Sequence, residues 1–202
     1  MIPLPLSFYR RPALTVAREL LGKFLFRDSN GRTAGGIIVE TEAYTGREDA
    51  ACHAYKLASP TPGHRTAVMF QPGGCVYVYL IYGMYCCFNV VTGGAGSPEA
   101  VLVRALEPTL GLEEMMARRR TRNPKKLCSG PGKLCMALAI SRADSGADLS
   151  AKTLFIADSD EVSEALVART PRVNVAYSGS AAALPFRFVV RDSAFLSTKK
   201  GL

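Results

Sequence analysis

Residues 75–91 read CVYVYLIYGMYCCFNVV and contain four of the eight tyrosines of the chain. They lie in the middle of a longer run that has no charged side chain. Alternate side chains of an extended segment share a face, so Tyr77 and Tyr79 are expected on the same side. Tyr82-Gly83 supplies a turn, because glycine adopts a positive φ at little cost, and a second β-rich stretch follows. The pattern predicts a β-hairpin with aromatic rings near its tip.

Two other interpretations of this segment have to be weighed. Tyrosines in a strand are often half-buried sheet residues with no ligand. A transmembrane helix fits poorly, because the apolar stretch is interrupted by Gly83 and Asn89 and falls short of the roughly 20 residues that a bilayer requires. An aromatic surface on a rigid hairpin is suited to stacking on nucleobases or wedging between them.

The charge distribution favours the nucleic-acid interpretation. The chain has 25 lysines and arginines against 17 aspartates and glutamates, a formal net charge of +8. The whole excess falls between Met115 and Ala143, where no acidic residue occurs. The eight basic residues of this block are Arg118, Arg119, Arg120, Arg122, Lys125, Lys126, Lys133 and Arg142. A local basic block is typical of a surface that contacts the phosphate backbone, although a solvated basic face or a flexible loop would have the same composition.

Length and composition predict one domain over residues 1–202, with enough chain to bury a core. Residues 1–11 have no long apolar segment, so we expect no secretory signal. Six cysteines occur at irregular spacings without a Cys-x-x-Cys pair, and there are only two histidines. We therefore expect no metal site, and we expect reduced thiols in a cytoplasmic protein, associated with the nucleoid in a bacterium or located in the nucleus of a eukaryote.

The local patterns mix strands with helices. We expect strands at residues 23–27, 37–44, 100–106, 153–156 and 186–191, besides the hairpin, and helices at residues 13–21, 112–120 and from about 130 to 138. Acidic residues begin the second of these helices and arginines end it, as the helix dipole prefers. Short turns between the strands predict an α+β domain, in which a curved antiparallel sheet carries a protruding β-hairpin and is surrounded by helices.

Two carboxylates interrupt an apolar strand in the segment IIVETEAY, residues 37–44. In an extended chain Glu40, Glu42 and Tyr44 share one face. An apolar setting suits a general base that activates water, because desolvation makes the carboxylate more basic. Alternatively, either glutamate simply pairs with an arginine at the sheet edge, such as Arg104 or Arg65. Arg104 lies in a largely apolar strand, so we expect it to be buried and paired, where it could orient a carboxylate or a water.

The remaining motifs are weaker. His53 could hydrogen-bond a base edge or hold a phosphate, or it could be purely structural. The GPGK segment at residues 130–133 lacks the spacing of a phosphate-binding P-loop, although it could offer backbone amides to a DNA phosphate. No arrangement of Ser, His and Asp indicates a nucleophilic triad, and no cysteine is indicated as a nucleophile.

Four segments taken together resemble the alkyladenine (3-methyladenine) DNA glycosylase family, the compact type unrelated to the helix-hairpin-helix glycosylases. They are VETEAY at residues 39–44, YVYLIYGM at 77–84, RALEP at 104–108 and LCSGPGKL at 127–134. The likeness extends from about residue 18 to 197, and the four motifs in this order make it specific. It implies a monofunctional enzyme of base excision repair, which flips a damaged purine out of duplex DNA and hydrolyses its N-glycosidic bond.

The resemblance also implies roles for individual residues. Glu42 corresponds to the base that activates water, and Arg104 to the arginine that helps to place it. The walls of the base pocket correspond to Tyr44, His53 and Tyr79, and Asn89 corresponds to a pocket residue that disfavours the amino group of guanine. Tyr82 corresponds to the side chain that fills the gap left by the flipped nucleotide. The expected DNA contacts are Tyr82, Met84, Arg118, Arg119 and Lys133.

The expected substrates are alkylated or deaminated purines: 3-methyladenine, 7-methylguanine, hypoxanthine and ethenoadenine. The expected partner is damaged double-stranded DNA, bound by a monomer, with no membrane, metal or cofactor involved. The alternative is a non-catalytic nucleic-acid-binding module with the same basic block and tyrosines. A sugar hydrolase using Glu40 and Glu42 as its pair fits poorly, since neighbouring side chains on one face cannot flank a glycosidic bond from opposite sides.

Overall fold

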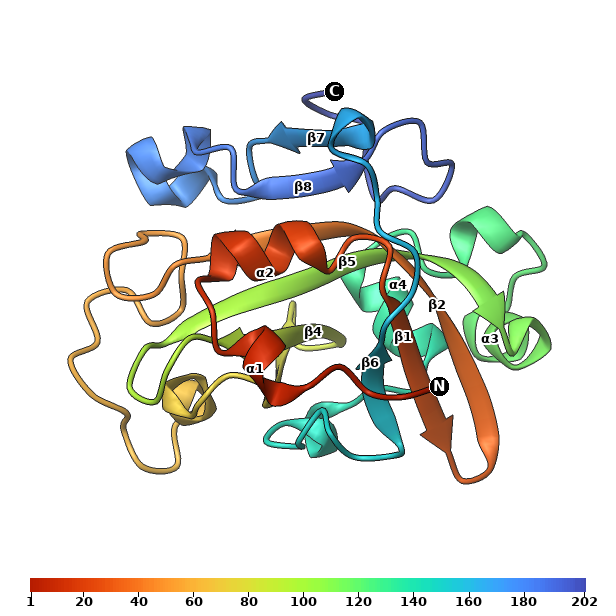
Figure 1. Ribbon diagram of the computed structural model, residues 1–202, viewed down its shortest axis with the longest axis horizontal. Coiled ribbons are helices and arrows are strands. Elements are labelled where there is room, and N and C mark those ends of the chain that lie inside the picture. Colours follow the sequence, from red (N-terminus) through yellow and green to blue (C-terminus); the bar gives the residue numbers. More distant parts are fainter.

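An antiparallel sheet of eight strands organises the molecule, and the computed structural model describes all residues 1–202 (Figure 1). The strands are β1 (Phe24–Ser29), β2 (Arg32–Tyr44), β3 (Val76–Ile81), β4 (Tyr85–Thr92), β5 (Glu99–Leu110), β6 (Leu154–Ala157), β7 (Val167–Thr170) and β8 (Arg187–Val190). The α-helices are α1 (Leu6–Tyr9), α2 (Ala13–Glu19), α3 (Leu112–Arg119) and α4 (Pro131–Ala137). Short 3-10 helices are η1 (Arg65–Phe70), η2 (Pro124–Lys126), η3 (Arg142–Asp144), η4 (Glu164–Leu166) and η5 (Ala176–Ala183). The predicted α+β class with an antiparallel sheet is confirmed.

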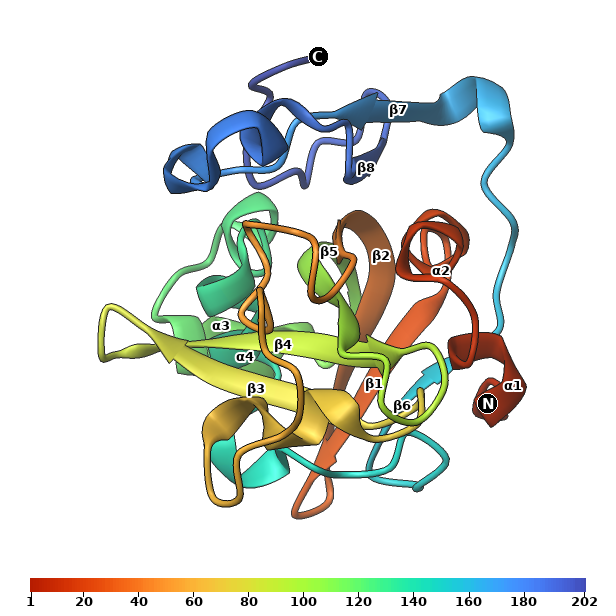
Figure 2. The ribbon, with the colours of Figure 1, turned by 90° about the vertical axis from the view of Figure 1, so that its left-hand side faces the viewer.

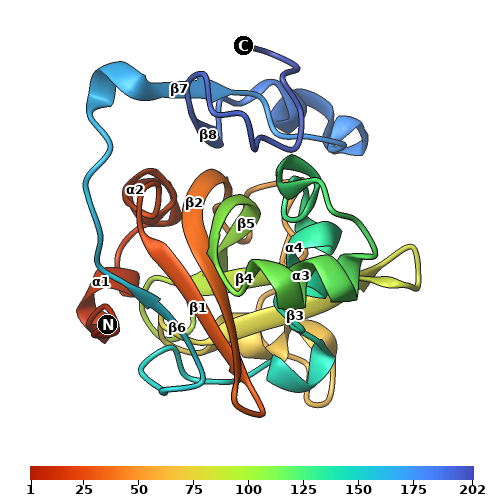
Figure 3. The ribbon, with the colours of Figure 1, turned by 90° about the vertical axis from the view of Figure 1, so that its right-hand side faces the viewer.

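The long strand β2 is the branch point of the sheet. The main strand order is β3-β4-β5-β2-β1-β6, and β8, with β7 beside it, also pairs with β2. Residues 32–37 of β2 pair with β1, whereas residues 40–42 pair with β8. Along its other edge β2 pairs with β5 over nearly its whole length. Figures 2 and 3 show β2 bending as it passes from one partner to the other, which places β7 and β8 as a separate layer above the body.

Two irregularities lie opposite each other where β2 leaves β1. The register between β2 and β5 shifts on either side of Glu40, so that Val39 is unpaired in β2 and Arg104 is unpaired in β5. A β-bulge bends its strand and redirects the neighbouring side chains. Glu40 and Glu42 still share a face, as predicted, since both contact Arg104. On the other face the Thr41 hydroxyl donates to the Ala17 carbonyl of α2 at 2.7 Å.

The predicted hairpin is present as β3 and β4. Ile81 pairs with Tyr85, and both Tyr82 and Gly83 between them have positive φ, of 53° and 71°. With Met84 they form a three-residue loop, in which the Met84 N–H donates to the Ile81 carbonyl at 3.3 Å. Figures 2 and 3 show the tip of this hairpin reaching beyond the rest of the body.

The main hydrophobic core lies between the sheet and its helices. Helix α2 packs against β2 and β5, and α4 packs against β4 and β5. Figure 3 shows α2 on one side of the β2–β5 pair and α3 and α4 on the other. A smaller buried cluster behind the hairpin consists of Cys52, Ala54, Met69, Tyr77, Val91 and Ala100. This second cluster supports the aromatic side chains described below.

Most predicted elements occur within a few residues of their expected bounds, but β2 and β5 are longer than predicted. The first part of β2 was not predicted because it contains Gly35 and Gly36, and glycine is unfavourable in a strand interior. Both glycines are required by close packing: a Cβ at Gly36 would overlap the Glu107 carbonyl of β5, and one at Gly35 would overlap the Phe24 ring. Strand β7 was not predicted. None of the helices is both long and apolar enough to cross a bilayer.

Candidate active site

A cleft of about 770 Å³ opens at the base of the hairpin, between the sheet, α4 and the layer that carries η5. Its lining includes three of the four predicted pocket residues, Tyr44, His53 and Tyr79, together with Arg104. A slightly larger hollow of about 820 Å³ lies far from these residues, beside α1 and α2. Most charged side chains of that hollow pair with one another, as Lys23 does with Asp158, and none of the predicted pocket residues lines it.

Aromatic rings from two segments form one wall of the cleft. Tyr77 and Tyr79 lie on the same face of β3 with ring centroids 5.5 Å apart, as the alternation predicted. The His53 ring meets Tyr79 edge-on at 4.4 Å, and its Nδ1 is 2.9 Å from the Tyr77 hydroxyl. Burial, with a smaller contribution from the positive charge of Arg65, lowers the pKa of His53 to about 4. The imidazole is therefore neutral at physiological pH.

Glu42 lies fully buried next to this cleft. The backbone N–H of Val173 donates to its Oε1 at 2.7 Å, and the Tyr44 hydroxyl donates to its Oε2 at 2.8 Å. Arg104 Nη1 lies 3.4 Å from the same Oε1. Tyr44, Arg104 and Val173 all line the cleft, whereas the Glu42 carboxylate lies behind this lining and is not part of it.

Glu40 and Arg104 form a second buried contact directly behind Glu42. Arg104 Nε donates to Glu40 Oε1 at 2.9 Å. Burial opposes charge on both groups, but Glu42 and Glu40 raise the pKa of Arg104, and Arg104 with Arg187 and the Ser197 amide lowers the pKa of Glu40. Pairing with two arginines therefore accounts for Glu40, whereas Glu42 is held by residues that line the cleft.

Asn89 occupies a deeper position than the other predicted pocket residues. Its side-chain amide donates to the carbonyls of Tyr77 and Cys87, both at 3.1 Å, and it is buried. It borders a small cavity of about 40 Å³ behind the aromatic wall, which Tyr44, His53 and Tyr79 also line. The structure thus brings Asn89 against the back of the pocket and leaves it outside the main cleft.

The predicted DNA-contacting residues fall into two groups. Tyr82 and Met84 at the hairpin tip are 74% and 68% exposed, so both rise from the surface without packing partners. Arg119 and Lys133 line the cleft, although Arg119 Nε also donates to the Leu127 carbonyl at 3.1 Å. Arg118 is engaged internally, donating to the Ala137 carbonyl at 3.0 Å. It is the least available of the predicted phosphate contacts.

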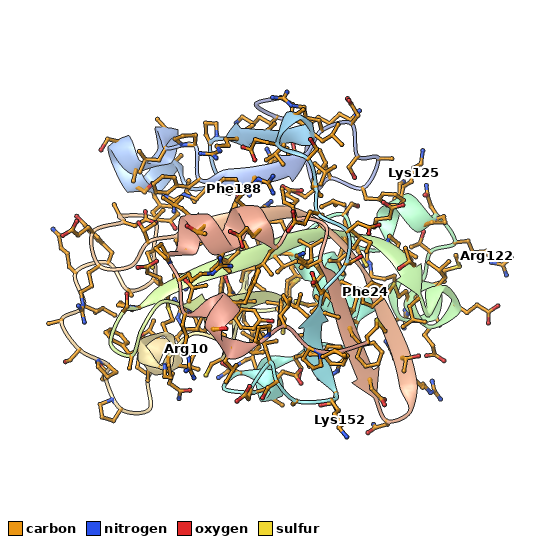
Figure 4. The ribbon with its side chains drawn as sticks, viewed as in Figure 1. Arg10, Phe24, Arg122, Lys125, Lys152 and Phe188 are labelled. Carbon is orange, nitrogen blue, oxygen red and sulfur yellow. The ribbon has the colours of Figure 1, made fainter.

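Other members of the basic block extend into solvent. Arg122 and Lys125 project outward at the end of the molecule where α3 lies (Figure 4). Arg120 ends α3 in a left-handed conformation, with φ 50°. The basic residues of α3 and of the loop after it therefore form one exposed region, and Arg119 connects it to the cleft, whereas Arg142 lies apart on η3.

Several residues of the site were missed from the sequence, and all come from the last third of the chain. Val173 supplies the amide that holds Glu42, and Tyr177 lines the cleft. Arg187 and Ser197 both bind Glu40. Arg187 shows the signal that identified Arg104, a single arginine in an otherwise apolar strand. The role of Val173 depends on its backbone amide, which no residue type indicates, and Ser197 binds Glu40 through both its amide and its hydroxyl.

Arg172 holds the Tyr44 wall in place. Its guanidinium lies 4.8 Å from the centroid of the Tyr44 ring and 5.2 Å from that of Phe186. It also forms a buried two-point ion pair with Asp49, which belongs to the loop leading to His53. One arginine therefore connects β2, this loop and the layer above them.

A cleft walled by aromatic rings, with a buried carboxylate behind its lining and a basic surface beside it, fits the class of enzymes that act on single bases of DNA. Comparison with known proteins identifies the family. The family model "Methylpurine-DNA glycosylase (MPG)" matches residues 7–194. The chain therefore belongs to the methylpurine-DNA glycosylase family and is a DNA glycosylase, which confirms the resemblance seen in its motifs.

Three relatives illustrate the extent of this similarity. A protein of Myxococcus xanthus is 50% identical over 96% of this chain and 93% of its own length. One of Methanocella arvoryzae is 46% identical over 97% of this chain and 96% of its own length. One of Bacillus cereus is 43% identical over 96% of this chain and 98% of its own length. Each bears the name "Putative 3-methyladenine DNA glycosylase".

Proposed function

We propose that this glycosylase removes alkylated or deaminated purines from duplex DNA, with Glu42 as the base that activates water. The observation that carries the proposal is the buried Glu42 carboxylate, held by Val173 and Tyr44 next to an aromatic cleft. The expected substrates are 3-methyladenine, 7-methylguanine, hypoxanthine and ethenoadenine. The names of the relatives support the first of these.

The aromatic wall accounts for binding of the damaged base. Tyr44, His53 and Tyr79 present ring faces and edges to the cleft, and stacking contributes roughly 1–3 kcal/mol per base. 3-Methyladenine and 7-methylguanine carry a positive charge, which the faces of tyrosine rings attract. A neutral His53 does not oppose that charge. The wall thus favours a cationic purine over a normal one.

The chemical step follows from the position of Glu42. A water oxygen attacks C1′ of the deoxyribose, the bond from C1′ to the base nitrogen breaks, and its electron pair leaves with the purine. The proton of the water goes to Glu42, while the carboxylate stabilises the positive charge that develops on the sugar. In a cationic base the departing electron pair neutralises the ring. In a neutral base, hydrogen bonds must stabilise the leaving purine instead.

The hairpin tip accounts for access to the base. Flipping a nucleotide costs a few kcal/mol, and least where damage has weakened its pairing. The exposed Tyr82 ring can enter the vacated stack, with Met84 beside it. Arg119 and Lys133 at the cleft border can contact phosphates of the flipped strand. The proposed attack uses water activated by Glu42 rather than the Lys133 amine, so we expect an intact strand with an abasic site.

The Glu42→Gln variant tests the proposal. It keeps the side-chain volume and removes the proton acceptor, so excision of hypoxanthine from a duplex should fall by at least about 100-fold. The measurement is formation of alkali-labile abasic sites under single-turnover conditions, with binding to the same duplex followed in parallel. Binding should persist.

Glu107→Gln is the matched control for this variant. Glu107 lies exposed on the same strand as Arg104, and its side chain makes no hydrogen bond or ion pair, so its variant should excise at the wild-type rate. Undiminished excision by Glu42→Gln would refute the role of Glu42. A wild-type protein that binds damaged duplex and releases no base would instead be the binding module considered above.

A further inference from the structure

We propose that Glu40 and Ser197 are positioning residues that hold Arg104 against Glu42, so that the carboxy-terminal tail takes part in catalysis. The inference rests on the proposed roles of Glu42 and Arg104, and it extends them to residues that do not border the cleft. Its basis is one fully buried carboxylate at the junction of β2, β5 and the tail.

Glu40 is surrounded by hydrogen-bond donors. Its Oε1 accepts from Arg104 Nε at 2.9 Å, from Arg187 Nε at 2.7 Å and from the Ser197 hydroxyl at 2.7 Å. Its Oε2 accepts from the backbone N–H of Ser197 at 2.6 Å. A carboxylate with four donors has a single stable orientation, because any rotation would leave buried donors unpaired.

This arrangement determines where the Arg104 guanidinium points. Its Nε is bound to Glu40, and its Nη2 donates to the Ser197 Oγ at 3.1 Å. A guanidinium is a rigid plane, so fixing two nitrogens fixes the third. The remaining nitrogen, Nη1, faces Glu42 at 3.4 Å. Glu40 and Ser197 therefore set the distance between the cation and the proposed base.

The tail is held in place by the second arginine of the cluster. Arg187 is fully buried and donates to the carbonyls of Thr198 at 2.6 Å and Lys200 at 2.9 Å. It also donates to the Thr170 hydroxyl of β7 at 3.1 Å. These contacts fix the backbone around Ser197. Figure 1 shows the C-terminal end of the chain in the layer with β7 and β8.

The balance of charge gives Glu40 a role beyond stability. Arg104 and Arg187 bring two positive charges, which Glu40 and Glu42 match. Without the charge of Glu40, Arg104 would turn toward Glu42 as its remaining carboxylate and form a two-point ion pair with it. Such a pair would occupy the oxygens that the attacking water needs. Glu40 thus keeps Arg104 close to Glu42 and prevents Arg104 from occupying the Glu42 oxygens that accept the proton.

A double-mutant cycle of Glu40→Gln and Arg104→Gln tests the proposal in the full-length protein. The readouts are single-turnover excision of hypoxanthine and binding of a duplex with an uncleavable abasic-site analogue. Glu40→Gln should slow excision about 10- to 100-fold with binding unchanged, as expected for a small displacement of a catalytic group. In the Arg104→Gln background the same substitution should slow excision no further, because it acts through Arg104.

Two outcomes would overturn the positioning role and leave the proposed function intact. One is wild-type excision by Glu40→Gln while Arg104→Gln is impaired. The other is an equal additional loss in both backgrounds. Full activity of Arg104→Gln would instead contradict the proposed role of Arg104, and the positioning role with it.

Ser197→Ala and Thr170→Val form a matched pair that decides the question even if Glu40→Gln does not fold. Each removes one hydroxyl from the cluster, but only the Ser197 hydroxyl contacts Glu40 and Arg104, whereas that of Thr170 contacts Arg187. We expect Ser197→Ala to slow excision and Thr170→Val to leave it unchanged, at comparable thermal stability. Equal slowing by both variants would show that the cluster is only structural.

Discussion

Glu42 illustrates how a single residue carries charge in the interior. Burying a carboxylate costs several kcal/mol unless hydrogen bonds compensate. Val173 and Tyr44 supply two such bonds, and Arg104 lies at 3.4 Å without a short contact. The contact with Arg104 is thus looser than that between Arg104 and Glu40. A loosely paired, well-oriented carboxylate is suited to accepting a proton.

His53 shows the opposite solution, an ionisable group kept neutral. Its low pKa, about 4 against an ordinary 6.5, follows from burial and then from the charge of Arg65. Between pH 6.5 and 4 the unfolded chain binds a proton at this position and the folded chain does not. Stability therefore falls as the pH drops through this range. The group contributes fully only above pH 6.5.

The low pKa of His53 and the loss of stability at acidic pH can both be measured. The ring signals of His53 in an NMR titration should show the neutral form down to about pH 5, and its midpoint should lie near pH 4. On lowering the pH from 7 to 5, the melting temperature should decrease more in the wild type than in His53→Gln. His64→Gln, which alters an exposed histidine, assigns the signals and serves as the control. A His53 midpoint near pH 6.5 would contradict the prediction.

At the scale of elements, the hairpin turn places a bulky residue in an unfavourable conformation. Tyr82 has φ 53°, a region that side chains other than glycine, asparagine and aspartate rarely adopt. Its ring is exposed, so no packing in the free protein compensates for the strain. Local strain of this kind occurs where function requires the residue. Entry of the ring into DNA would be such a function.

Tyr82→Asn separates strain from function. Asparagine tolerates positive φ, so the free energy of unfolding should rise by up to about 1 kcal/mol. Excision should slow, because the ring that fills the vacated stack is absent. Denaturant unfolding and single-turnover excision of ethenoadenine measure the two effects. Tyr82→Phe keeps the ring and should retain excision. Equal excision rates for the two variants would contradict insertion of the Tyr82 ring into the DNA stack.

The sequence predicted those elements and site residues whose signals are local. Alternating tyrosines with a Tyr-Gly turn predicted the β3–β4 hairpin, and the Glu40–Glu42 spacing predicted a shared face. It did not predict the bulges or the branching of β2, because register depends on which strands pair. Arg187 and Ser197 were missed for the same reason: they lie near Glu40 only after β8 has paired with β2.

At the scale of the whole molecule, the excess positive charge is concentrated near the cleft. Arg119 and Lys133 line the cleft, and Arg122 and Lys125 project nearby from the end marked by α3 (Figure 4). Lys152 projects from the opposite part of the molecule, near the β1–β2 turn (Figure 4). This asymmetry would orient the protein toward DNA before any specific contact forms.

Salt dependence of binding tests this orientation. Affinity for duplex DNA should fall with ionic strength, with a log–log slope of about −0.9 for each phosphate neutralised. Lys133→Ala should reduce the magnitude of the slope by about 1, whereas Lys152→Ala, which removes another exposed lysine far from the cleft, should not change it. Identical slopes for the two variants would place the phosphate contacts away from the cleft.

The paired bulges at Val39 and Arg104 have a consequence for how this enzyme can change over evolution. Because side chains alternate between the two faces of a strand, the number of residues that follow the Val39 bulge decides which of them lie on the cleft side. Glu42 and Tyr44 lie on that side only if this number does not change. One residue inserted between the bulge and Thr41 would turn Thr41 toward the cleft and the Glu42 carboxylate toward α2. Length variation among related sequences should therefore accumulate in surface loops and be absent from this short stretch.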